Sequence, residues 1–284
     1  MKAQMKHALK LGRWQMRRAQ LRLKHGQVSS PVLFANSFPK SGTHLLTQVL
    51  AGFAQFGPFA MTGLNAVTMY DGPTGAPRPM AEIETVLHRL RPGDISYGHL
   101  HAEPEIISAL CREGVAPYFI LRDPRDVVVS HVFYVTELEP NHVHHRYYAE
   151  ELHTFEERLR VSILGRPELA HPFPDIRGRF EPYMGWLDRP EMLVLRFEDF
   201  ILNRRETLGR VLVHAAARGF AYDGDLDAAV DLLSATIDPE NSPTFRSGKV
   251  GGWKAHFTPA FKDLFKQVSG DLLIRLGYEQ DVDW

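Results

Sequence analysis

Short apolar runs alternate with longer segments of helical character along most of this chain. The runs at 32–35, 118–121 and 192–197 have the length and composition of buried strands. Helices are expected at 45–50, 82–90, 199–217, 226–237 and 259–276. A glycine- and proline-rich loop at 72–79 and a polar, histidine-rich segment at 137–180 interrupt this order. The alternation predicts an α/β fold without internal repeats.

Length and composition are those of a chain with one sizeable core. The chain has 284 residues, 44% hydrophobic and 24% charged, so we expect a basic N-terminal arm at 1–26 and a single domain at 27–284. The net charge of −1 argues against a general nucleic-acid binder. Cys111 is the only cysteine and cannot form an internal disulfide, which favours a reducing, cytoplasmic compartment. No apolar run reaches the length of about 18 residues that a membrane span needs.

The N-terminal arm is strongly basic. No acidic residue precedes Asp71, and eight lysines and arginines lie between residues 2 and 24, with apolar residues interspersed at partly helical spacing. A basic helix of this kind could lie on an anionic membrane surface. We favour the alternative of a solvated or partly disordered arm, whether or not it packs on the domain, because its apolar face is not clean. The arm also lacks the long apolar region of a secretory signal.

The segment Phe38-Pro39-Lys40-Ser41-Gly42-Thr43-His44 lies between the strand at 32–35 and the helix at 45–50. Such a loop suits a phosphate-like anion, because backbone N–H groups and the helix dipole favour negative charge there. Lys40 adds a full positive charge, and Ser41 and Thr43 add hydroxyl donors. We therefore expect a protein that binds or acts on a phosphorylated or sulfated ligand.

This loop does not match the Walker A pattern of ATPases and GTPases. That pattern, G-x-x-x-x-G-K-[ST], places its lysine after a glycine, whereas Lys40 precedes the loop's only glycine, Gly42. Pro39 also stands where flexibility is expected. An ordinary ATPase or GTPase is therefore disfavoured, although short segments of this kind also occur by chance in turns.

Two further segments carry basic residues suited to an anion. The strand at 118–121 runs into Arg122, and Pro124 breaks the strand before a helix that Asp126 can start and that contains Ser130. Arg122 thus lies at the carboxyl end of a strand, where open α/β sheets bind ligands. The glycine-rich segment at 245–254 contains three basic residues and is suited to closing over an anion.

Together these three segments resemble the sulfotransferases that use 3′-phosphoadenosine 5′-phosphosulfate (PAPS). Residues 39–43 resemble the family's 5′-phosphosulfate loop, residues 122–130 its 3′-phosphate motif, and residues 246–254 its C-terminal R-K-G-x-x-G-D-W-K element. Their order and spacing also fit. The resemblance implies a P-loop-like three-layer α/β fold with a central parallel sheet flanked by helices. The chain resembles the soluble, cytosolic-type members of this family and has the appearance of a divergent, bacterial member.

The resemblance also implies roles for single residues. Lys40 would stabilise charge on the leaving phosphate as the sulfuryl group departs, and Arg122 and Ser130 would hold the 3′-phosphate. Phe197, at the end of the strand at 192–197, would line the adenine pocket. The implied cofactor-binding residues are Lys40, Ser41, Gly42, Thr43, His44, Leu45, Arg122, Ser130, Phe197, Arg246, Ser247 and Gly248.

Four positions depart from the cytosolic pattern. His44 and Leu45 stand where that branch often has threonine and tryptophan, so an adenine-stacking aromatic is missing. Ser247 replaces a lysine near the 3′-phosphate, and Gly252 replaces the usual aspartate. Because the loss of one charged hydrogen bond costs about 1.5–3 kcal/mol, we expect weakened nucleotide binding.

A base must take the proton of an acceptor hydroxyl, and histidine suits that task because it titrates near neutral pH. The cytosolic branch uses the histidine of a K-T-H-L-P segment between the first two motifs. Residues 95–101 fall in that interval and match it at His99 and Leu100, so His99 is the expected catalytic base beside Lys40. His101 and Glu103 are the alternatives, and His99 could instead cap a strand end.

The expected activity is transfer of a sulfuryl group from PAPS to a hydroxyl of a small-molecule, lipid or glycan acceptor. The in-line displacement would leave adenosine 3′,5′-bisphosphate (PAP) and need no metal. A P-loop kinase-like phosphotransferase and a non-catalytic nucleotide-binding protein remain as alternatives. The histidines at 131, 142, 144 and 145 offer no complete metal-ligand set and are assigned to a loop near the acceptor. The oligomeric state is left open.

Overall fold

The computed structural model describes residues 2–26, 28–72, 74–242 and 248–284; the side chains of residues 2–8 and 11 are outside this description. The chain forms two compact units. Unit 1 comprises residues 1–69, 78–121 and 185–245, and unit 2 comprises residues 70–77, 122–184 and 246–284.

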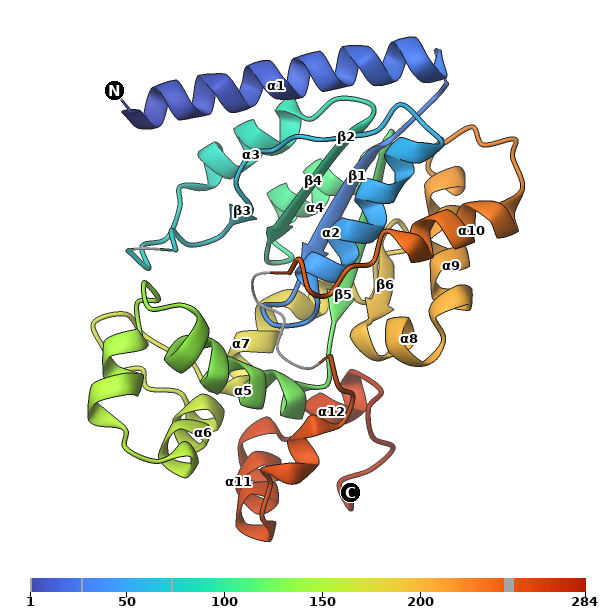
Figure 1. Ribbon diagram of the computed structural model, residues 1–284. Helices are drawn as coiled ribbons and strands as arrows, with labels where there is room; N and C mark the ends of the chain where they lie inside the picture. Colours follow the sequence, from blue (N-terminus) through green and yellow to red (C-terminus); the bar gives the residue numbers. More distant parts are fainter. Residues whose placement is uncertain (1, 27, 73, 243–247) are drawn as a thin grey trace. The chain divides into compact units, whose positions relative to one another are not determined.

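Unit 1 is built on a parallel sheet of six strands (Figure 1). The strands follow the order β2-β4-β1-β5-β6, with β3 also paired to β4. Their bounds are β1 Val32–Ser37, β2 Ala60–Met61, β3 Val67–Thr68, β4 Asp94–His99, β5 Val115–Leu121 and β6 Leu193–Arg196. Each of the five pairings is parallel, as alternating strands and helices require.

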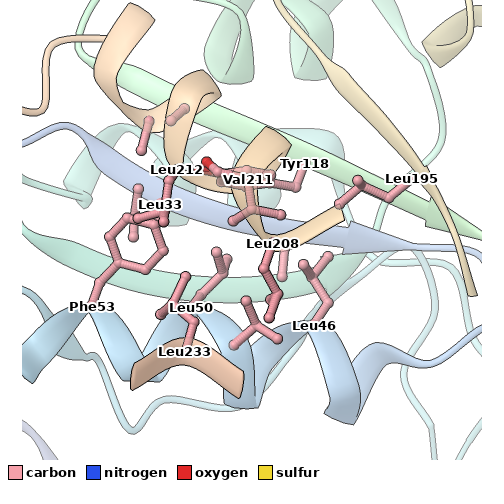
Figure 2. Close-up of a cluster of buried hydrophobic side chains, with 14 of the residues drawn as sticks. Leu33, Leu46, Leu50, Phe53, Tyr118, Leu195, Leu208, Val211, Leu212 and Leu233 are labelled. Carbon is pink, nitrogen blue, oxygen red and sulfur yellow. Dashed lines mark hydrogen bonds between the residues drawn. The ribbon is translucent and has the colours of Figure 1, made fainter. Parts of the chain in front are cut away.

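Helices cover both faces of this sheet, with α2 and α10 on one face and α4 on the other (Figure 1). Leu33 and Tyr118 of the sheet meet Leu50, Val211 and Leu233 of the helices in a continuous buried cluster (Figure 2). The helices of unit 1 are α1 Lys2–His25, α2 Thr43–Gly52, α3 Met80–Arg89, α4 Pro104–Leu110, α8 Phe197–Leu202, α9 Arg204–Ala217 and α10 Leu226–Ala235, with a 3-10 turn at Phe53–Gln55. The predicted three-layer α/β fold is confirmed.

Unit 2 is mostly helical. Its interior holds Arg125, whose Cζ lies 4.2 Å from the ring centre of Trp253 and 4.5 Å from that of Trp284. Asp123 and Glu279 pair with the same guanidinium, which ties the start of α5 to the C-terminal segment. Its elements are α5 Pro124–Phe133, π-helices Tyr134–Leu138 and Tyr147–Glu151, α6 Phe155–Leu164, α7 Ile176–Phe180, the 3-10 turn Gly252–Ala255, α11 Pro259–Ser269 and α12 Leu272–Arg275. A 3-10 helix at Glu181–Trp186 continues the chain into unit 1.

Three predicted helices differ from the helices of the structure by a break or a shifted start. The helix expected at 199–217 is divided at Asn203, and the one expected at 259–276 is divided at Gly270, whose φ of 56° ends α11. Helix α5 begins at Pro124 rather than at Asp126. Asp123 caps it, because its carboxylate accepts a hydrogen bond from the N–H of Arg125.

The basic arm forms α1 and packs on unit 1, so it is not a disordered segment. Trp14 Nε1 donates to Oδ1 of Asp94 at 3.2 Å, and Arg18 Nε lies 3.8 Å from the same oxygen. Burial raises the pKa of Asp94, and the N–H of Arg91 together with Arg18 and Trp14 counteracts this effect. Among the described residues, no helix combines the length and hydrophobicity needed to cross a bilayer.

Candidate active site

The anion loop, residues 38–43, leads from β1 into the first turn of α2 and has the backbone of an anion site. Lys40, with φ of 68°, is the one non-glycine residue with positive φ among those described, and Gly42 follows at φ 95°. Left-handed residues in such a loop help turn successive N–H groups toward one side. The first N–H groups of α2 have no partner within a helix, and Gly42 offers no side-chain cap. An anion at this point would satisfy them.

Ser41 adds an independent observation in favour of an anion. Its side chain is completely buried, and its hydroxyl has no hydrogen-bond partner in the described part of the chain. An unsatisfied buried hydroxyl costs about 1–3 kcal/mol, and a phosphate or sulfate oxygen in the loop would remove that cost. The residues of the loop therefore fit a phosphosulfate group.

Neighbouring side chains leave no room for a Cβ atom at position 42. A Cβ added at this position would lie 2.8 Å from Cδ2 of Phe197 and 3.4 Å from Cδ1 of Ile120. Phe197 is 8% exposed and is the first residue of α8, directly after β6. The ring thus packs behind the loop, and its predicted contact with adenine stays a prediction.

His99 is the last residue of β4 and bonds to the last residue of β1. Its Nδ1 lies 2.9 Å from the carbonyl oxygen of Ser37 and 3.1 Å from the Ser37 hydroxyl. A carbonyl oxygen only accepts, so neutral His99 carries its proton on Nδ1 and its lone pair on Nε2. The Ser37 hydroxyl is also 2.8 Å from that of Thr43. Hydrogen bonds therefore connect the anion loop to His99.

The chain directly after His99 is fixed by two buried side chains. Asn36 donates to the carbonyl of Leu100 at 2.9 Å and accepts from the N–H of Leu100 at 2.8 Å. Trp186 Nε1 donates to the same carbonyl at 2.8 Å. These bonds hold the end of β4 in one position relative to β1, which orients the imidazole of His99.

Three histidines in this part of unit 1 have lowered pKa values. Burial is the largest effect on His99 and lowers its pKa. The hydrogen bond to the Ser37 carbonyl raises this pKa, and repulsion from His44 and Lys40 lowers it further. Burial and then Lys40 lower the pKa of His44, and burial lowers that of His101. These shifts favour neutral imidazole at neutral pH, which is the form that a base requires.

The residues predicted to hold a 3′-phosphate belong to unit 2. Arg122 donates to the carbonyl of Lys249 at 2.8 Å, and its Nη2 lies 3.4 Å from Oδ2 of Asp126. Ser130 follows Asp126 by one turn of α5 and so shares its face of the helix. The structure thus brings Arg122 against the glycine-rich segment near the C-terminus.

Asp126 organises that glycine-rich segment. Its carboxylate accepts from the N–H of Gly251 at 2.9 Å and from the N–H of Trp253 at 2.8 Å. The backbone at Gly251 and Trp253 is therefore held by the same side chain that pairs with Arg122. Gly248 is described and partly buried, whereas Arg246 and Ser247 lie outside the described residues.

Sequence reasoning missed Ser37, Asn36 and Asp126 as members of the candidate site. The position of Asp126 four residues after Arg122 is the signal that could have identified it. The pairings of Ser37 with His99 and of Asn36 with Leu100 bridge more than 60 residues and have no local signal.

The remaining candidates have less support from geometry. Glu103 precedes α4 as its N-cap residue, without a side-chain capping bond. In the histidine-rich segment of unit 2, His144 bonds to the carbonyl of His171 and His145 to that of Val135. Within the described ranges, no group of three or more His, Cys, Asp and Glu side chains is arranged to hold a metal ion.

A hollow of about 910 Å³ lies at the amino ends of the strands. Its lining includes Pro31, Pro92 and Gly114, which precede β1, β4 and β5. The anion loop follows the carboxyl end of β1, so the hollow is not part of the candidate site.

No protein-family model matches the chain. A 3-alpha-hydroxysteroid sulfotransferase of Cavia porcellus is 25% identical over 167 residues, which are 53% of this chain and 53% of that protein. A 3-beta-hydroxysteroid sulfotransferase of the same species is 22% identical over 164 residues, with the same shares covered. The chain spans about half the length of the curated relatives that it matches.

Solved structures agree over a larger part of the chain. Mouse sulfotransferase SULT7A1 complexed with PAP superposes with a TM-score of 0.58 at 17% identity, covering 94% of each chain. Retinol dehydratase in complex with androsterone and inactive cofactor PAP gives a TM-score of 0.56 at 16% identity, covering 89% of this chain and 82% of the other. The chain has the fold of these proteins. The predicted resemblance to sulfotransferases is confirmed in sequence and in fold.

Proposed function

We propose that this protein transfers a sulfuryl group from PAPS to the hydroxyl group of a small molecule. The observation that carries the proposal is the hydrogen-bonded junction at Ser37, which joins an anion loop to a histidine with its lone pair on Nε2. Sulfuryl transfer to a hydroxyl needs these two parts, a site for the phosphosulfate and a base. The similarity to two steroid sulfotransferases supports the same conclusion.

Candidate nucleotide-binding residues occur in each of the two units. In unit 1, Lys40, the Ser41 hydroxyl and the N–H groups from Gly42 to Leu45 would bind the 5′-phosphosulfate. In unit 2, Arg122 and Ser130 would bind the 3′-phosphate, because a guanidinium donates two parallel hydrogen bonds to phosphate oxygens.

In the proposed reaction, PAPS supplies an activated sulfuryl group. His99 would accept the proton of the acceptor hydroxyl at Nε2 while the acceptor oxygen forms its bond to sulfur. The bond between sulfur and the bridging oxygen of the 5′-phosphate breaks, and its electron pair stays on the phosphate. Lys40 and the loop N–H groups would stabilise that charge; preorganised donors of this kind are each worth about 3–4 kcal/mol.

We propose a small molecule with a free hydroxyl as the acceptor. A lipid or glycan hydroxyl would undergo the same transfer. Steroid alcohols are the first compounds to test, because two relatives are named for hydroxysteroids and one solved neighbour contains androsterone. We place the reaction in the cytoplasm, where the single free cysteine, Cys111, would stay reduced.

A variant of His99 tests the proposal. His99→Asn keeps an N–H donor near Ser37 but removes the Nε2 lone pair, so the rate of transfer from PAPS to a steroid alcohol should fall about 10²–10⁴-fold. The affinity for PAP should stay within about twofold, because the anion loop is unchanged. His88→Asn, at an exposed position of α3, is the matched control and should keep full activity.

Three results would contradict this proposal. Normal turnover by His99→Asn would remove the base assignment and direct the test to His101→Asn and Glu103→Gln. Tight PAP binding by the wild-type protein without transfer to any hydroxyl compound would favour the non-catalytic alternative. Binding and turnover of ATP in place of PAPS would favour the kinase-like alternative.

A further inference from the structure

Helix α1 carries a ridge of three exposed apolar side chains, of which Leu23 also borders the hollow at the amino ends of the strands. Leu9, Met16 and Leu23 follow one another at intervals of seven residues, which places them on one side of the helix. Their side chains are 58%, 63% and 88% exposed. Large apolar side chains at this exposure, aligned on one helix, form a surface for contact with something outside unit 1.

The opposite face of α1 is the one that packs on unit 1. Trp14 and Arg18 bond to Asp94, and Leu21 is partly buried. At 100° per residue these three side chains lie roughly 120–180° around the helix from Leu9. The apolar residues that make the sequence pattern of α1 irregular therefore belong to two different faces.

Basic side chains border the apolar ridge on one side. Arg13, Arg17 and Lys24 are exposed and lie roughly 40–80° around the helix from Leu9. Lys10, at roughly 100°, donates to Oδ1 of Asn65 at 3.3 Å. The nearest acidic residue along the sequence is Asp71. The outward face thus combines a narrow apolar ridge with a row of positive charge.

We propose that α1 docks on the anionic surface of a lipid bilayer, with its axis parallel to the membrane. Leu9, Met16 and Leu23 would enter the boundary between headgroups and acyl chains, while the basic row would pair with lipid phosphates and carboxylates. A second copy of the chain fits less well, because two such ridges in contact would bring like charges together. A nucleic acid would leave the apolar ridge unexplained. This proposal does not depend on sulfuryl transfer.

Co-sedimentation of the full chain with vesicles tests the proposal. The wild-type protein should bind vesicles of phosphatidylcholine mixed with phosphatidylserine and not vesicles of phosphatidylcholine alone. Binding should weaken as the salt concentration rises. The double variant Met16→Ser, Leu23→Ser should lose at least about tenfold in the partition coefficient, because it removes most of the apolar surface that enters the bilayer.

Charge variants test whether binding to the vesicles depends on the basic row of α1 or only on the net charge of the protein. The triple variant Arg13→Gln, Arg17→Gln, Lys24→Gln should lose on the order of 100-fold in partition onto the anionic vesicles, since each basic residue contributes about fivefold. The matched control removes three exposed arginines from α6, the 185–192 segment and α9 and should bind like the wild type; its substitutions are Arg160→Gln, Arg189→Gln and Arg204→Gln.

Specific results would overturn the proposal. These are no binding to the anionic vesicles, equal binding to both kinds of vesicle, or equal losses in the charge variant and its control. A wild-type dimer in analytical ultracentrifugation that the Met16→Ser, Leu23→Ser variant converts to monomer would assign the ridge to a second copy instead. Far-UV circular dichroism and thermal unfolding of each variant check that α1 remains folded.

Discussion

Asp126 is expected to be essential for the C-terminal glycine-rich segment, which makes Asp126→Asn an informative variant. The side chain is 3% exposed, and its two oxygens accept from the N–H groups of Gly251 and Trp253. Arg122 pairs with it at 3.4 Å. Asparagine has nearly the same shape, but it has one acceptor oxygen and no charge.

The size of the effect follows from these three contacts. One backbone N–H loses its acceptor and faces an NH₂ group, and a hydrogen bond to a charged group is worth about 1.5–3 kcal/mol. The pairing with Arg122 is also lost. Together these losses should lower the free energy of unfolding by about 2–4 kcal/mol, which corresponds to a fall in Tm of roughly 3–7 °C for a chain of this size.

Urea unfolding monitored by tryptophan fluorescence measures this change. Gly252→Ala is the matched control in the same segment, because its added Cβ would lie 3.5 Å from Oδ1 of Asp126, an ordinary contact. That control should shift the free energy of unfolding by less than about 1 kcal/mol. In an Arg122→Met background, Asp126→Asn should cost less than in the wild type. A wild-type unfolding curve for Asp126→Asn would refute this account of the segment.

Three further predictions concern unit 1. Gly42→Ala should lower the free energy of unfolding by about 2–4 kcal/mol, through its left-handed φ and the contact with Phe197; Gly63→Ala, which meets nothing within 4 Å, should cost only about 1 kcal/mol, and equal losses would contradict the packing argument. Burial lowers the pKa of His214 to about 4 from its ordinary 6.5, so the unfolded chain binds more protons and stability should fall by about 3 kcal/mol between pH 6.5 and 4. Urea titrations of His214→Gln should lack this share of the pH dependence. Ser37→Ala keeps the carbonyl acceptor but loses the hydroxyl, so kcat should fall up to about tenfold with little change in PAP affinity, and an equal loss in both would contradict a positioning role.

The parts of the fold that depend on adjacent residues could be predicted from the sequence. The unit from β1 through the anion loop to α2 is continuous, and its glycine, lysine and apolar flanks all lie within 21 residues. The arginine at the end of β5 was found in the same way. Helix ends were less predictable, because Asn203 and Gly270 interrupt segments whose apolar pattern continues on both sides.

The hydrogen bonds that position the candidate site could not be predicted. Ser37 meets His99, and Asp126 meets Gly251 and Trp253, across 62 to 127 residues of sequence. Such pairs depend on strand register and on the path of the C-terminal segment, neither of which has a local pattern. The packing of α1 on the rest of unit 1 is a similar case, because it depends on the buried carboxylate of Asp94, which lies 80 residues after Trp14 in the sequence.

Binding of PAP tests the central claim most directly. Thermal unfolding of the wild-type protein and of Lys40→Met is measured with PAP and, separately, with ATP. At about 100 times its dissociation constant a ligand adds roughly 2.7 kcal/mol of stability, so PAP should raise the Tm of the wild type by several degrees. The shift should be smaller in Lys40→Met and absent with ATP. No shift with PAP, or an equal shift with ATP, would contradict the proposal that this chain is a PAPS-dependent sulfotransferase.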